Sequence, residues 1–216
     1  EASEAYLVYT RFEEGIGGVL VDKDNPGLEI VETYTNMYGA HQSRIQFDDC
    51  RVDESQVLVR GEDAFVKLLK SFNVERCHNA MMCVACGLNA FDKAREHAAT
   101  RERFGQPIGE FQWIGWKFAE MATQLESARL LIYRAASNAV DGSPSRLETS
   151  MVKVAANEAG EFAVDEALQI HGAMGYSKES PIEYLYRWVR GWSIAGGTVE
   201  IQRDTIAEQL RKHGLD

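Results

Sequence analysis

The sequence predicts a mainly α protein with a β portion, in which a partial β domain precedes a bundle of helices. In the first sixty residues, β-branched and aromatic residues occur in short runs, as they do in strands. From Asp63 to Thr100 there is no proline, and alanines and large apolar residues recur at the spacing of a helix. We therefore expect residues 1–60 to form the β portion and residues 61–216 to form the helical domain.

Four segments of the β portion have the composition of strands. Residues 5–10 and 18–21 are rich in valine, leucine and tyrosine, and Asn25-Pro26-Gly27 is a turn signal. Residues 28–34 and 44–47 alternate between apolar and polar side chains, which is typical of strands with one buried face.

Five segments of the second part have helical patterns, at residues 63–100, 111–140, 146–170, 182–189 and 198–213. In the second of them, steps of three and four residues place five apolar residues on one face: Phe118, Met121, Leu125, Ala128 and Ile132. The third is expected to bury a face made of Ala155, Ala159, Phe162, Ala167 and Ile170. Long helices joined by short breaks favour a helical bundle.

Charge and composition exclude several classes of protein. The chain has 23 Lys and Arg against 33 Asp and Glu. A surface that binds nucleic acid usually needs an excess of basic residues, so this acidic balance disfavours a nucleic-acid partner. No apolar run reaches the roughly 20 residues that a membrane-spanning helix needs. The chain begins at Glu1 within a strand-like run, so we expect an upstream part that is missing here, including any targeting segment.

The four cysteines favour core packing over metal binding. Cys83 and Cys86 form a C-x-x-C pattern, but no second pair follows and no histidine stands at the spacing of a zinc ligand. Reduced thiols in an intracellular compartment are the simplest interpretation. We expect the bacterial cytoplasm or the mitochondrial matrix.

Two glycine clusters stand at helix breaks, at residues 172–175 and 196–197. Neither matches a Rossmann or a P-loop pattern, because neither lies between a strand and a helix. Each is compatible with a helix cap followed by a turn. Each is also compatible with close approach of the backbone to a ligand, in which Thr198 and the free N–H groups of the last helix would face an anionic group.

Three motifs, in order along the chain, resemble those of the acyl-CoA dehydrogenase family. Residues 101–108 (RERFGQPI), followed by Phe111 and Gln112, are similar to its R-x-x-F-G-x-x-I segment with a glutamine following. Residues 169–176 (QIHGAMGY) resemble its Q-I-x-G-G-x-G-Y signature, and residues 194–203 (IAGGTVEIQR) resemble its I-Y-E-G-T-x-x-I-Q-R segment. Together with the strand region, the resemblance covers essentially the whole chain.

The resemblance implies a fold, a cofactor and partners. Residues 1–60 would be the second half of the family's middle β domain, and residues 61–216 its C-terminal four-helix bundle. The family binds FAD, oxidises acyl-CoA thioesters, usually assembles as homotetramers and reduces electron-transferring flavoprotein. Since the helical N-terminal domain and part of the β domain are absent, residues 1–216 are not expected to hold a complete active site.

The resemblance also assigns a cofactor site. Arg101 would hold the FAD pyrophosphate, a role that suits a guanidinium because it can bind two phosphate oxygens at once. Phe104 and Gln112 would line the same site, and Gln169, Gly172 and Ala173 would pack their backbone along the FAD of a neighbouring subunit. Thr198 and Glu200 match cofactor-contacting positions near the start of the last helix. Ala173 stands where the family usually has glycine, so a close backbone approach is less strongly implied there.

The most informative departure from the family is Gly196, at the position where most members carry the catalytic glutamate. A minority, including the isovaleryl-CoA and long-chain dehydrogenases, carries the base on the first bundle helix, directly before an arginine. Glu75 and Arg76 match that pair, although a lone helical glutamate is otherwise a solvent-facing residue. The resemblance therefore implies that Glu75 removes the α-proton, and that the N–H of residue 196 binds the thioester oxygen.

Arg76, Ala195 and Gly197 are expected at the substrate site. Most relatives have a tyrosine and a glutamate where this chain has Ala195 and Gly196, so the missing side chains leave space near the reacting carbons. That space predicts a branched, cyclic or otherwise bulky acyl group.

Three alternatives to a dehydrogenase remain open. An acyl-CoA oxidase or a nitroalkane-oxidase-like flavoenzyme would pass electrons to oxygen. A paralogue without a base would be a structural or regulatory subunit, and Glu75 is the feature that opposes it. A plain helical interaction module would leave the three motifs without an explanation.

Overall fold

The computed structural model describes residues 3–215, which divide into two compact units. One unit extends to Phe72 and the other begins at Asn73, so the division falls inside the first long helix. The last strand of the first unit ends at Val59 and the helix begins at Ala64. The expected domain boundary at residue 60 remains a prediction.

The first unit is built from two antiparallel pairings. A three-stranded sheet has the order β1-β2-β5, and β3 pairs separately with β4. The elements are β1 (Ala5–Phe12), β2 (Gly15–Asp22), β3 (Leu28–Thr35), β4 (His41–Phe47), the 3-10 helix η1 (Glu54–Gln56) and β5 (Val57–Val59). The four strands expected from the sequence are confirmed, and each is longer than its apolar run. The short strand β5 was not expected.

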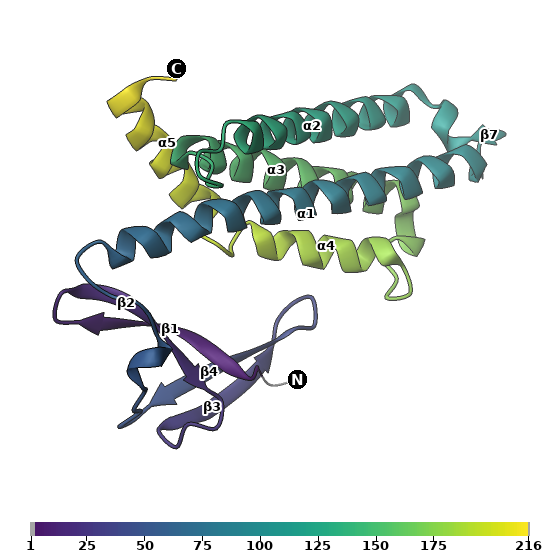
Figure 1. The fold of residues 1–216 in the computed structure, drawn as a ribbon. Helices are drawn as coiled ribbons and strands as arrows, with labels where there is room; N and C mark the ends of the chain where they lie inside the picture. Colours follow the sequence, from purple (N-terminus) through teal and green to yellow (C-terminus); the bar gives the residue numbers. More distant parts are fainter. Residues whose placement is uncertain (1–2, 216) are drawn as a thin grey trace. The chain divides into compact units, whose positions relative to one another are not determined.

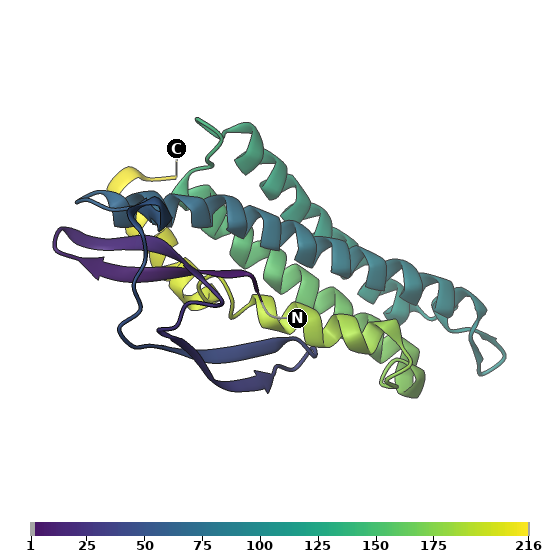
Figure 2. The same ribbon diagram turned by 60° about the horizontal axis from the view of Figure 1, so that its bottom comes forward.

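The second unit contains most of α1 (Ala64–Thr100) and four further α-helices. These are α2 (Gln112–Ser137), α3 (Arg146–His171), α4 (Pro181–Trp192) and α5 (Val199–His213). The connections hold β6 (Glu102–Arg103), β7 (Gln106–Pro107), η2 (Ile108–Glu110) and η3 (Gly172–Met174). All five predicted helices are confirmed. Figures 1 and 2 show α1, α2, α3 and α4 alongside one another, with α5 at one end of the bundle.

Helix boundaries follow local capping groups. The side chains of Ser145, Ser180 and Thr198 accept hydrogen bonds from backbone N–H groups in the first turns of α3, α4 and α5. Gly172 follows α3 with a φ of 60°, a left-handed conformation that favours glycine. Both glycine clusters of the sequence therefore stand at helix ends.

The predicted apolar face of α2 is confirmed, because Met121, Leu125, Ala128 and Ile132 are all buried. On α3 the buried face is centred differently from the prediction. Ala155 and Phe162 are only partly buried at its edge, whereas Lys153 and Asn157 are fully buried. Two polar side chains therefore lie in the middle of the helix that contacts α2, α4 and α5.

The closest approach between α1 and α3 depends on two glycines. A Cβ atom at Gly160 of α3 would lie 2.8 Å from the carbonyl oxygen of Cys83, and one at Gly87 of α1 would lie 3.4 Å from the Cα atom of Gly160. Two helices can approach this closely only where side chains are absent. The crossing places Cys83 and Gly87 of α1 directly against α3.

Among residues 3–215, no helix is both long enough and apolar enough to cross a bilayer.

The crossing yields a stability prediction. Gly160→Ala should lower the free energy of unfolding by about 1–3 kcal/mol, because the new methyl group forces α1 and α3 apart. Gly115→Ala is the matched control: it also lies in a helix, and a Cβ atom there meets nothing within 4 Å. The control should raise stability by about 0.5–1 kcal/mol. Urea unfolding of both variants measures the two effects, and a Gly160→Ala protein as stable as the control would contradict the tight crossing.

Candidate active site

A turn of six residues, Ser193 to Thr198, joins α4 to α5 and lies against α1 and α3. Within the turn, the N–H groups of Ile194 and Ala195 donate to the Gly191 carbonyl at 3.1 and 3.0 Å. The N–H of Val199 donates to the Ser193 carbonyl at 3.2 Å. The local sequence thus closes the turn, and side chains from elsewhere hold it in place.

Three helices each supply one side chain that donates to a carbonyl group of this turn or of the residue preceding it. Lys153 Nζ of α3 donates to the Trp192 carbonyl at 2.8 Å. Arg76 Nε of α1 donates to the Gly196 carbonyl, and Gln202 Nε2 of α5 donates to the Gly197 carbonyl, both at 3.2 Å. We call Arg76, Lys153 and Gln202 the carbonyl anchors.

Both glycines of the turn have left-handed backbones, with φ of 68° at Gly196 and 89° at Gly197. A Cβ atom at Gly197 would lie 2.7 Å from Gln202 Nε2. That amide is fully buried and is oriented by Ser150, whose hydroxyl donates to Gln202 Oε1 at 2.9 Å. Residue 197 therefore has to be glycine for both steric and conformational reasons.

Glu75 and Gly196, which are far apart in the sequence, are neighbours in the structure. A Cβ atom at Gly196 would lie 3.8 Å from Glu75 Oε1, 3.3 Å from Asn79 Nδ2 and 3.9 Å from Lys153 Nζ. Asn79 also donates to Glu75 Oε1 at 3.4 Å. The Glu75 carboxylate thus lies close to the place where a side chain of residue 196 would begin.

The N–H group of Gly196 is available to a ligand. Within residues 3–215 it makes no hydrogen bond, whereas the carbonyl group of the same residue is held by Arg76. Glu75 is exposed in this chain. A carboxylate that lies beside a free backbone N–H group can take a proton from a ligand, while the N–H group stabilises the oxyanion that forms.

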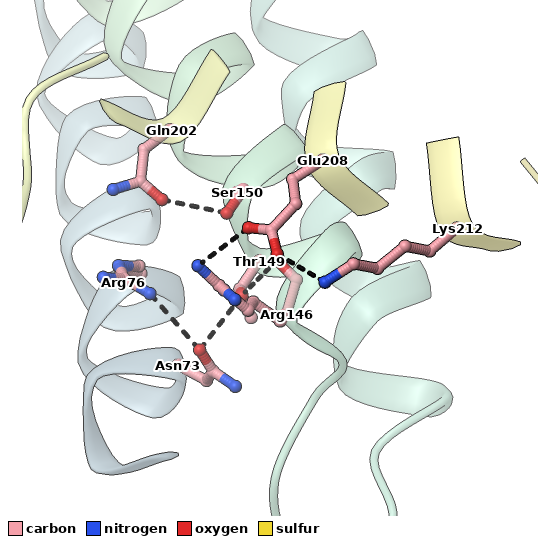
Figure 3. A network of polar contacts seen from close by, with 8 residues as sticks. All are labelled: Asn73, Arg76, Arg146, Thr149, Ser150, Gln202, Glu208 and Lys212. Carbon is pink, nitrogen blue, oxygen red and sulfur yellow. Dashed lines mark hydrogen bonds and ion pairs between the residues drawn. The ribbon is translucent and has the colours of Figure 1, made fainter. Parts of the chain in front are cut away.

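A polar network surrounds two of the carbonyl anchors, Arg76 and Gln202 (Figure 3). Arg76 Nη1 donates to Asn73 Oδ1 at 3.3 Å, and the Asn73 amide donates to the Pro144 carbonyl at 3.3 Å. Burial lowers the pKa of Arg76, and the neighbouring Arg146 lowers it further, while Glu75 opposes this. Figure 3 also shows Arg146 paired with Glu208 of α5.

A second candidate site lies at the end of the bundle where α1 ends and α2 begins. A cavity of about 490 Å³ is lined by five of the residues expected to bind the cofactor, Arg101, Phe104, Gln169, Gly172 and Ala173. Two of the three sequence motifs therefore meet in one place. Gln112 is the exposed first residue of α2, whereas Thr198 and Glu200 lie with the third motif at the start of α5.

The lining of this cavity suits an anionic ligand with an aromatic or apolar part. Arg101 and Arg103 both line it and supply positive charge. Phe104 is 95% exposed and has a φ of 54°, an uncommon conformation for a bulky residue. The rings of His97 and His171 stack with centroids 4.5 Å apart at the wall of the cavity, and burial lowers the pKa of His97.

Three residues of the first site were not expected from the sequence: Asn79, Lys153 and Gln202. Gln202 lies within the quoted motif IAGGTVEIQR but had no assigned role. Lys153 had a detectable signal, because it falls on the apolar side of a helix between Val152 and Ala156, which are both buried. The only sequence feature that could have identified Asn79 is its position one helical turn after Glu75.

The cysteines show no catalytic environment. Cys83 is buried, and burial raises the pKa of its thiol to about 12. Burial also raises the pKa of Cys77 and Cys86. Within the part of the chain that the structure describes, no three His, Cys, Asp or Glu side chains are arranged to hold a metal ion.

Comparisons with known proteins agree with the fold. A family model described as "Acyl-CoA dehydrogenase, C-terminal domain" matches residues 65–211. The chain is 37% identical to the 3-sulfinopropanoyl-CoA desulfinase of Paraburkholderia xenovorans, over 96% of this chain and 56% of that protein. It is 35% identical to an acyl-CoA dehydrogenase of Bacillus subtilis, over 97% of this chain and 57% of that protein.

A solved structure of butyryl-CoA dehydrogenase from Megasphaera elsdenii matches with a TM-score of 0.90 at 26% identity, over 97% of this chain and 56% of that chain. The predicted fold class is thereby confirmed. The chain spans about half the length of the curated relatives it matches.

The glycine turn yields a prediction that separates steric contact from backbone conformation. Gly197→Ala should destabilise the protein by about 1–2 kcal/mol through its left-handed backbone, and by about 1–3 kcal/mol more because the methyl group displaces Gln202. Gly142→Ala is the matched control, since Gly142 has a φ of 73° but a Cβ atom there meets nothing within 4 Å. Thermal unfolding of both variants measures the difference. Equal destabilisation would show that the contact with Gln202 is unimportant.

Proposed function

The chain belongs to the acyl-CoA dehydrogenase family, and from that premise we propose that its protein removes two hydrogens from the α and β carbons of an acyl-CoA thioester. Glu75 is the base that takes the α-proton in this proposal. The observation that carries it is the proximity of Glu75 Oε1, 3.8 Å from the Cβ position of Gly196, where no side chain is present. Glu75 of α1 can therefore accept a proton at this place, whereas Gly196 has no side chain that could do so.

The residues of the turn have complementary roles in this reaction. Removal of an α-proton leaves negative charge on the thioester oxygen, and the free N–H of Gly196 is the donor for that oxygen. Arg76 holds the Gly196 carbonyl and so fixes the direction of the peptide unit that follows it. Asn79 donates to Glu75 and limits where its carboxylate can lie.

Members of the family are flavoproteins, and the second site fits FAD. Its basic and aromatic lining matches a ligand that carries both a pyrophosphate and a ring system. Arg101, Phe104, Gln169, Gly172 and Ala173 would hold the cofactor there, with Gln112 beside them. Thr198 and Glu200 lie near the other end of the bundle, close to Gly196, and would contact the FAD that a neighbouring copy of the chain holds. FAD held by the neighbouring copy would supply the acceptor for the β-hydride, its N5 atom.

We propose a branched, cyclic or bulky acyl group as the substrate. Ala195 is exposed and Gly196 has no side chain, so the surface next to Glu75 is uncovered. A bulky acyl group would fill that space and remove apolar surface from water.

A second candidate reaction is hydrolytic loss of the sulfinate group from a sulfinoacyl-CoA: the C–S bond breaks, the carbon takes a proton, and the oxygen of water adds to the sulfur, which leaves as sulfite. The relative named 3-sulfinopropanoyl-CoA desulfinase supports it, at 37% identity over 96% of this chain. Dehydrogenation requires an external electron acceptor, whereas release of sulfite does not. Assays of acceptor reduction and of sulfite release on the same preparation therefore separate the two reactions.

Assembly and electron transfer are part of the proposal. We propose a homotetramer that reduces an electron-transferring flavoprotein. Large aromatic side chains on the second unit support association between copies, because Trp113, Trp116 and Tyr176 are 55%, 63% and 79% exposed in the single chain.

Glu75→Gln tests the base. The substitution keeps the size of the side chain and removes its ability to accept a proton, so kcat of the full-length holoenzyme should fall by about 10²–10⁴. The flavin absorbance and the KM for acyl-CoA should stay close to those of the wild type. Steady-state assays with a dye acceptor measure both constants.

Glu120→Gln is the control for this variant, because Glu120 is an exposed glutamate on a different helix, α2. It should leave kcat unchanged. A flavin-loaded Glu75→Gln enzyme with wild-type turnover would show that another group removes the proton.

Ala195→Tyr tests the substrate class. The wild-type enzyme should have a higher kcat/KM for isobutyryl-CoA or cyclohexanecarbonyl-CoA than for butyryl-CoA. The new ring should fill the space beside Gly196, and so should shift the preference toward straight chains. A wild-type profile in which butyryl-CoA or octanoyl-CoA exceeds every branched and cyclic substrate would rule out the proposed pocket.

A further inference from the structure

We propose that Lys153 is a positioning residue for this reaction, which it serves by fixing the turn that carries the Gly196 N–H beside Glu75. The inference rests on the proposed function, and it adds a residue of α3 to the site. Lys153 is fully buried and is the largest of the fully buried side chains among the described residues.

The burial of Lys153 is costly for the fold. An ammonium group loses its hydration when it is buried, and an apolar side chain of similar volume would avoid that loss. Burial lowers the pKa of Lys153, and the neighbouring Arg76 lowers it further, whereas Cys83 and Glu75 raise it. A group that destabilises the core in this way needs a role other than filling space.

The contacts of Lys153 point to the turn. Its Nζ atom donates to the carbonyl of Trp192, the last residue of α4, at 2.8 Å. Carbonyl groups in the last turn of a helix have no partner within the helix, so a side chain can determine the direction in which the chain leaves it. The same Nζ atom lies 3.9 Å from the Cβ position of Gly196. One ammonium group therefore contacts the beginning of the turn and lies close to its reactive part.

The turn requires such an anchor because of its composition. Gly196 and Gly197 are adjacent and both have positive φ, and a Gly-Gly pair has access to many other conformations. Arg76 and Gln202 hold the carbonyls of these two glycines, and Lys153 holds the entrance to the turn. A backbone donor displaced by about 1 Å stabilises the developing charge much less.

Lys153→Met in the full-length holoenzyme tests the proposal. Methionine has a similar length but donates no hydrogen bond and has no charge. The kcat should fall by about 10- to 100-fold, whereas the flavin content and the KM for acyl-CoA should change little. A residue with a purely structural role would alter stability without this separation of kcat from KM.

Amide hydrogen exchange provides a readout that is independent of activity. The N–H groups of Ala195 and Val199 are hydrogen-bonded within the turn or to the end of α4. They should exchange faster in Lys153→Met than in the wild type, while the amides in the middle of α2 keep their protection. If the wild-type protein had no dehydrogenase activity, the proposed function would fail, and this comparison would still decide the role of Lys153.

Lys117→Met is the matched control, because Lys117 is a largely buried lysine that bridges α2 to Glu166 of α3, away from the turn. It should lower the melting temperature without changing kcat or the exchange of Ala195 and Val199. Lys153→Gln is a second variant that is neutral and too short to reach the Trp192 carbonyl, and it should behave as Lys153→Met does. The proposal is overturned if both Lys153 variants keep wild-type kcat and exchange, or if both lose the whole fold.

Discussion

The carbonyl groups of Trp192, Gly196 and Gly197 are held by three side chains from three helices, and the geometry of the candidate active site depends on these hydrogen bonds. Arg76, Lys153 and Gln202 each satisfy one carbonyl. With the oxygens fixed, the N–H of Gly196 is left free and lies beside Glu75. Two adjacent glycines can otherwise adopt many backbone conformations, so the anchors are needed to hold the turn in one of them.

The bundle brings the anchors together through α3, which contacts α2, α4 and α5 and crosses α1 at Gly160. Gly160 lies two helical turns after Lys153, and Cys83, which meets it on α1, lies one turn after Asn79. The close crossing therefore places Lys153 next to the part of α1 that carries Glu75 and Arg76. Stability and the proposed function share this contact, since the glycine that allows it also determines how near the proposed catalytic residues lie to α3.

The sequence predicted the helices well because apolar periodicity and capping residues are local signals. The proximity of Glu75 and Gly196 came only from the family resemblance, since no local pattern connects two residues so far apart. Lys153 could have been noticed as a lysine on the apolar side of its helix, but its role and that of Gln202 were missed because their partners are backbone carbonyls, which any residue type can supply. The short strand β5 was missed because it has only three residues, Val57–Val59. The roles of the predicted cofactor and catalytic residues remain proposals.

The central claim is that Glu75 and the Gly196 N–H act on one thioester group. A crystal structure of the full-length holoenzyme with a bound acyl-CoA tests it most directly. The account predicts a Glu75 carboxylate oxygen about 3–3.5 Å from the α-carbon, and the Gly196 nitrogen about 3 Å from the thioester oxygen. A complex in which Glu75 faces away from the α-carbon, while a different carboxylate contacts it, would contradict the account.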